Sequence, residues 1–135
     1  MKVRIPKRTM VLLYLPEDAP GGGEICAALQ REGLPFAGIS AQQLTLTVQD
    51  CFEGKEAVLP AKEAPGEAMA VFCNLSDSQL DGALAALRGL PVPLKAVMTP
   101  TNRSWSLLTL YRELCREREA IRQRQERKAN APQEG

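Results

Sequence analysis

The chain has 135 residues, of which 44% are hydrophobic and 24% charged, and its formal net charge is +1. This length suits one domain with a hydrophobic core and is short for two. No stretch approaches the roughly 18 consecutive apolar residues of a membrane span, and the first residues lack the apolar run of a signal peptide. The composition therefore predicts a soluble globular protein, which we expect in the cytoplasm and not in a membrane.

Missing residue types and patterns exclude several kinds of active site. The chain has no histidine, so hydrolase triads that use histidine are excluded. Its four cysteines form no Cys-x-x-Cys pair and are far apart, at Cys26, Cys51, Cys73 and Cys115. We therefore expect no metal site, no cofactor and four reduced thiols that serve packing. No residues form a catalytic signature, and the sequence leaves open whether the protein is an enzyme.

Charge is distributed unevenly along the chain. Residues 1–8 carry four basic and no acidic side chains, residues 9–102 carry five basic and eleven acidic ones, and residues 103–135 carry eight basic and five acidic ones. Regular apolar spacing stops before the C-terminal residues. We therefore expect a basic N-terminal arm at 1–8, a single α/β domain at 9–118, and a solvated helical extension with a disordered tail at 119–135.

The first half of the chain predicts two strands and two helices. The continuous apolar run at 9–15 is typical of a strand buried on both faces, and a helix at 24–32 follows a glycine-rich loop. A second strand is predicted at 35–39. The pattern Ser-x-x-Gln that opens residues 40–54 is a capping box, so we predict a helix there, followed by a surface loop at 55–67.

The second half predicts the same alternation. Residues 68–73 form another apolar strand, a second Ser-x-x-Gln box opens a helix at 76–89, and a fourth strand is predicted at 94–99. The last helix is predicted to begin near Asn102 or Arg103. This alternation predicts a four-stranded, mostly parallel sheet of order 2-1-3-4, with helices on both faces and a long C-terminal helix.

Three loops are expected to meet in this topology. The loops at 16–23, 74–76 and 99–105 should converge on the edge where α/β proteins bind ligands, beside the switch point between the first and third strands. Glycines 21–23 suggest a phosphate-binding loop, but the segment lacks the Walker lysine and has acidic neighbours. We therefore interpret it as a flexible loop.

The segment at 99–105 carries the best candidates for a contact site. Its hydroxyl, amide and guanidinium groups can bind a carboxylate or phosphate, and arginine and tryptophan often anchor protein interfaces. A structural interpretation is equally open, in which Thr101 or Asn102 caps the last helix and a largely buried Trp105 packs on the sheet. We assign no catalytic residue. The candidate ligand or partner contacts are Asn74, Thr99, Thr101, Asn102, Arg103 and Trp105.

The same segment resembles a known family. Its characteristic pattern, Lys-Ala-Val-x-Thr-x-Thr-Asn-x-x-Trp, is matched at Lys95, Ala96, Val97, Thr99, Thr101, Asn102 and Trp105. Over about residues 9–118 the chain is similar to this family of small uncharacterised proteins, a domain of unknown function found chiefly in clostridia-like Gram-positive bacteria. The resemblance supports the domain boundaries and implies a bacterial protein. It implies no activity, cofactor or catalytic residue.

Three functions are weighed on these grounds. We prefer a non-catalytic binding or regulatory module that contacts a protein partner through the 99–105 edge and the C-terminal helix, because no acid, base or nucleophile pair can be assembled. The alternative is a small anionic-ligand-binding or enzyme domain with its site at the carboxyl edge of the sheet. A second alternative is weak nucleic-acid binding through the arginine-rich helix at 112–128. Its mixed charges and the acidic middle of the chain argue against that interpretation.

Overall fold

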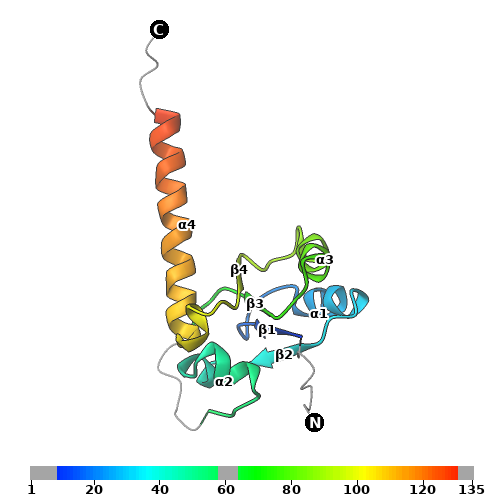
Figure 1. Ribbon diagram of the computed structural model, residues 1–135. Helices are drawn as coiled ribbons and strands as arrows, with labels where there is room; N and C mark the ends of the chain where they lie inside the picture. The colour runs from blue at the N-terminus through cyan, green and yellow to red at the C-terminus, as the bar shows by residue number, and fades with distance from the viewer. Residues whose placement is uncertain (1–8, 58–63, 131–135) are drawn as a thin grey trace, which may run out of the picture.

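The computed structural model describes residues 9–57 and 64–130, and in it four strands form one sheet (Figure 1). The predicted basic N-terminal segment at 1–8 and the end of the predicted tail, 131–135, lie outside the described residues. The strands are β1 (Met10–Tyr14), β2 (Phe36–Ile39), β3 (Met69–Cys73) and β4 (Leu94–Val97). The α-helices are α1 (Gly22–Arg31), α2 (Val48–Phe52), α3 (Asp77–Leu87) and α4 (Leu107–Asn130). Two short 3₁₀ helices are η1 (Gln42–Thr45) and η2 (Asn102–Ser104).

The predicted strand order and mostly parallel sheet are confirmed. The order is β2-β1-β3-β4, with a parallel pair at each side of the sheet and an antiparallel pair, β1 and β3, in the centre. Tyr14, the last residue of β1, is paired with Ile39 at the end of β2 and with Met69 at the start of β3. The chain therefore leaves β2 and reaches β3 at the same edge of the sheet, and β3 runs back in the opposite direction.

The antiparallel centre corrects the expected meeting of three loops. The loop at 16–23 follows β1, whereas the loops at 74–76 and 99–105 follow β3 and β4. Because β3 and β4 run opposite to β1, the first loop lies at one edge of the sheet and the other two lie at the opposite edge. The expected convergence is wrong.

An approximate twofold axis relates the two halves of the chain. Leu12 is paired with Val71 at the centre of the sheet, and Thr47 forms an isolated bridge with Ser106. Residues in each pair are 59 positions apart in the sequence, so a single shift of numbering relates β1 to β3 and also relates Thr47 to Ser106. Each half has the order strand, helix, strand, 3₁₀ helix, helix. The fold is therefore one βαβα unit used twice.

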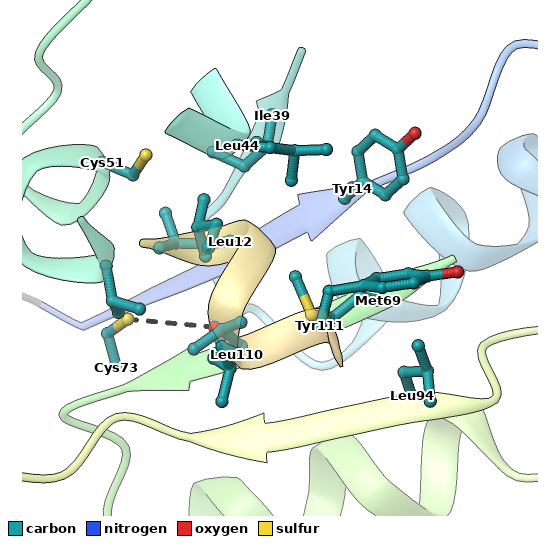
Figure 2. Close-up of a cluster of buried hydrophobic side chains, with 13 residues drawn as sticks. Leu12, Tyr14, Ile39, Leu44, Cys51, Met69, Cys73, Leu94, Leu110 and Tyr111 are labelled. Carbon is teal, nitrogen blue, oxygen red and sulfur yellow. Dashed lines mark hydrogen bonds between the residues drawn. The ribbon is translucent and has the colours of Figure 1, made fainter. Parts of the chain in front are cut away.

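Helices cover both faces of the sheet, as predicted. Since side chains alternate along a strand, Val11 and Phe72 pack beneath α1 and α3, while their neighbours face η1, α2 and α4. Figure 2 shows the second of these clusters. At one end of it Tyr14 and Tyr111 meet edge to face, with ring centroids 6.5 Å apart. The core thus consists of two layers separated by the sheet.

The predicted helix at 40–54 is wrong in its first part. Its Ser-x-x-Gln box exchanges both expected hydrogen bonds, but the box closes only η1. Leu46 and Thr47 are extended, and the Leu46 carbonyl accepts a hydrogen bond from Leu107 N at 2.9 Å. This pairing with the other half satisfies backbone groups that a continuous helix would satisfy internally. The α-helix therefore begins only at Val48.

The last helix is interrupted in the same way. The predicted start falls in η2, and Trp105 is then extended, with its carbonyl bonded to the first backbone N–H of α2 at 2.9 Å. Ser106 Oγ accepts from Thr109 N at 3.0 Å and caps α4. The predicted cap at Thr101 or Asn102 is therefore wrong. The Ser-x-x-Gln box of α3, by contrast, is confirmed as its N-cap.

The segment before β3 is held by two tyrosines and one ion pair. Tyr14 Oη donates to Pro65 O at 2.6 Å, and Tyr111 Oη accepts from Glu67 N–H at 3.2 Å. Arg118 of α4 binds both carboxylate oxygens of Glu67, at 2.6 and 2.7 Å. These contacts fix the middle of α4 against the start of β3.

Candidate functional site

Asn102 is the one buried polar side chain among the described residues, with 8% of its surface exposed. Its Oδ1 accepts from Thr99 N–H at 2.8 Å, and its Nδ2 donates to Val97 O at 3.0 Å. Its backbone N–H donates to Thr99 Oγ1 at 3.1 Å. The Asn102 amide and the Thr99 hydroxyl therefore close the turn between β4 and η2, which is a structural task.

The other candidates in this turn differ in exposure. Thr101 and Arg103 are exposed, whereas Trp105 is partly buried against the cluster of Figure 2 and is less enclosed than predicted. Asn74 lies at the same edge of the sheet, at the end of β3, with a left-handed φ of 59° that asparagine tolerates. Its carbonyl accepts from Thr9 Oγ1 at 3.3 Å. The turn thus presents Thr101 and Arg103 to the outside.

A shallow depression lies where the two halves meet. Its lining includes Arg103 and Ser104 of the second half and Thr47 and Asp50 of the first. A hydrogen bond from the Lys55 ammonium holds the pKa of the Asp50 carboxyl below its ordinary value, so Asp50 is negatively charged. This carboxylate beside Arg103 opposes the binding of an anion.

A larger cleft, of about 650 Å³, lies at the opposite edge of the sheet, where β1 and β2 end. Its walls come from residues 14–20, 39–42 and 64–66, and the only charged side chains among them are Glu17 and Asp18. Two carboxylates in an otherwise uncharged lining make this cleft unfavourable for an anionic ligand.

The long helix α4 projects well beyond the sheet (Figure 1). All side chains from 116 to 129 are exposed, and the helical residues 119–130 are here called the arm. The equivalent helix of the first half, α2, ends at Phe52, which the 59-residue shift relates to Tyr111. Among the residues that the structure describes, the first half therefore has no counterpart to the arm.

Charges differ between the sides of the arm. On one side Arg122 binds Glu119 at 2.6 Å and Glu126 at 3.2 Å, so these three charges partly neutralise one another. The three other cationic side chains of the arm form no hydrogen bond or ion pair with any residue that the structure describes. They are Arg124, Arg127 and Lys128.

A groove separates the base of the arm from β4, the outermost strand of the second half. Its lining is mostly apolar and consists of Pro93, Leu94, Lys95, Leu114, Glu117, Arg118 and Ile121. Ile121 is 47% exposed, the largest exposed fraction among the three exposed large hydrophobic side chains of the described residues. An apolar side chain thus lies open at the edge of this groove.

The buried thiols are poor candidates for catalysis. Burial raises the pKa of Cys51 to about 11 and that of Cys73 to about 12, so both stay protonated near neutral pH and are weak nucleophiles. All four cysteines are free. In the described ranges no group of three or more histidine, cysteine, aspartate or glutamate side chains could hold a metal ion.

Within residues 9–57 and 64–130, no helix combines the length and apolarity needed to cross a membrane.

The second half of the chain is similar to a known protein family. Residues 68–121 match the family described as a domain of unknown function (DUF3783). The match begins just before β3 and ends at Ile121, so it covers the second βαβα unit and the base of the arm, and includes the Lys95–Trp105 pattern. The expected resemblance is confirmed for this span, and the family description names no activity. Neither a curated protein nor a solved structure matches the chain.

Sequence reasoning missed the groove. It assigned every residue from 119 onward, including Ile121, to a solvated helical extension and tail. The available signal was the spacing of Leu114 and Ile121, which are seven positions apart and therefore lie on one side of a helix. The partner of that side, β4, could be identified only from the packing.

Proposed function

We propose that this protein is a non-catalytic protein-binding module and that the arm contacts the partner. The observation that carries the proposal is that α4 continues through 14 consecutive exposed residues, 116–129, after its first turns are buried in the core. A polar helix of this length is marginal in isolation, because packing supplies most helical stability. Anchoring in the core and the Arg118–Glu67 ion pair support such a helix in a fixed direction.

We propose the exposed residues at the other end of α4 as a secondary contact. Thr99, Thr101 and Arg103 have exposed side chains around the turn before α4, and Asn74 lies at the same edge of the sheet. Replacement of Arg103 by alanine should change the free energy of unfolding by less than about 0.5 kcal/mol, as for other exposed side chains. It should weaken partner binding if this turn contributes. The carboxylates in the shallow depression and in the larger cleft make an anionic ligand the weaker candidate.

Truncation of the arm tests the proposal. The immobilised full chain and a chain ending at Arg118, which keeps the Glu67 ion pair, are compared for proteins retained from a cell extract of the source organism. A protein retained only by the full chain is then purified and titrated against both chains by calorimetry. We expect saturable binding to the full chain, with at least tenfold weaker binding to the truncated one. Equal affinities, with both chains folded, would refute the role of the arm.

A further inference from the structure

The groove beside β4 continues along one side of the arm. Ile121 lines the groove, and Leu114 lies seven residues earlier on the same side of α4. Arg124 and Lys128 follow Ile121 at i+3 and i+7, so helical periodicity places them on this side too. We call this the groove side of α4. It has apolar residues at the base and basic residues toward the tip.

The opposite side of the arm is chemically different. Glu119, Arg122 and Glu126 also follow one another at i, i+3 and i+7, and they are joined by ion pairs. Because Arg122 is already bound to two carboxylates, it is a weaker binding group for a partner than an unpaired cation. Arg124 and Lys128, in contrast, have no such partner among the described residues. Of the three arm cations without a partner in the described part of the chain, Arg124 and Lys128 therefore lie on the groove side, and Arg127 lies on a neighbouring side.

The base of the groove adds to this charge. Lys95 of β4 lines it, with its Nζ donating to Val92 O at 2.7 Å, and Glu117 is the one acidic side chain in the lining. Arg118, also in the lining, is bound to Glu67. The groove and the groove side of α4 together carry three cations that form no ion pair within the described chain, Lys95, Arg124 and Lys128. Against them stands one carboxylate without an ion pair in that part of the chain, Glu117.

On the basis of the proposed function, we infer that the groove side of α4 binds an acidic amphipathic helix of a partner protein. Its apolar side would cover Ile121 and the groove, and its carboxylates would face Lys95, Arg124 and Lys128. A helix fits because these contacts are spaced along another helix, and helix-in-groove recognition uses anchors at i, i+3, i+4 and i+7. The apolar base favours a protein over a nucleic acid, whose phosphates gain nothing from Leu94, Leu114 or Ile121.

A synthetic peptide tests this inference on the full chain. The probe is a fluorescent 20-residue peptide with leucines at i, i+3, i+4 and i+7 and glutamates at most other positions. Its controls are a peptide of the same composition with scrambled order and a duplex DNA oligonucleotide. Fluorescence anisotropy should give micromolar affinity for the probe and at least tenfold weaker affinity for both controls. Equal affinity for the scrambled peptide or the DNA, or no binding of the probe at millimolar concentration, would overturn the inference.

Matched variants locate the binding side. Arg124→Gln on the groove side and Gln123→Glu on the opposite side, where Gln123 donates to Glu119, each change the net charge by −1. We expect Ile121→Ser to weaken peptide binding about tenfold and Arg124→Gln about three- to tenfold, and Gln123→Glu less than about twofold. Circular dichroism establishes that each variant is folded. Equal effects of Arg124→Gln and Gln123→Glu would overturn the inference. If arm truncation abolishes retention of a partner while the groove-side variants bind normally, the proposed function stands and this inference fails.

Discussion

The two halves of the molecule share one architecture and differ in their last helix. β1 and β3 have five residues each, β2 and β4 have four each, and α1 and α3 have ten and eleven. In contrast, α2 has five residues and α4 has 24. Both halves contribute to the same sheet and core, so the shared elements account for the fold. The shared elements do not require the added length of α4, so this added length indicates a function other than folding.

The turns before the last helices show a second difference. In each half a hydroxyl residue and an amide residue three positions later exchange two hydrogen bonds, Ser40 with Gln43 and Thr99 with Asn102. Only Asn102 is buried, and only its side chain also binds the preceding strand, at Val97 O. The same local solution therefore has a larger structural role in the second half, where the helix must carry the arm.

The largest effect is expected where the halves meet. Leu107 is fully buried, and its backbone N–H bonds to the first half, so Leu107→Ala should lower the free energy of unfolding by about 2–5 kcal/mol. Urea unfolding, followed by far-UV circular dichroism and by Trp105 fluorescence, measures this loss. Leu84→Ala, at a 39% exposed position, is the control and should cost clearly less. A cost below about 1 kcal/mol at Leu107, or two separate transitions, would show that the halves fold independently.

A smaller effect distinguishes the two turns. Asn102→Asp keeps the shape of the side chain but removes the donor to Val97 O, so it should cost about 1–3 kcal/mol, the range for an unsatisfied buried polar group. The equivalent change, Gln43→Glu, alters a side chain that is only partly buried and should cost less. Thermal unfolding of both variants at pH 7 makes the comparison. Equal costs would mean that the burial of Asn102 is irrelevant.

Much of the fold was predictable from local pattern. Apolar runs predicted the four strands, because a strand's apolar pattern depends on neighbouring residues. The strand order and the helices on both faces followed from the alternation of strands and helices together with general topology rules. The twofold repeat was not predictable, since corresponding strand residues such as Leu12 and Val71 share apolar character but not identity. The broken helices were missed because Leu46 and Trp105 bond to partners distant in the sequence. The candidate turn was found, but only packing separates buried Asn102 from exposed Arg103.

The ion pair at the base of the arm should contribute a small, pH-dependent stabilisation. Hydrogen bonding to Arg118 lowers the pKa of Glu67 below its ordinary value, so the stabilisation is present above about pH 4.5 and is lost as pH falls through the lower folded pKa. Both side chains are more than a third exposed, so Glu67→Gln should cost no more than about 1 kcal/mol at pH 7. Urea unfolding at pH 7 and near pH 2 measures the difference. A cost that persists unchanged in acid would contradict the ion pair as its cause.

Amide hydrogen exchange along α4 in the free protein tests most directly whether the arm is anchored only at its base and does not itself pack on the core. Residues 107–115 pack on the core, so their amides should exchange only through global unfolding. Beyond Arg118 all described side chains are exposed, so protection should fall steeply and residues 122–130 should exchange by local fraying. Protection at 122–130 equal to that at Leu110 would contradict the division of α4 into a structural base and a free binding arm.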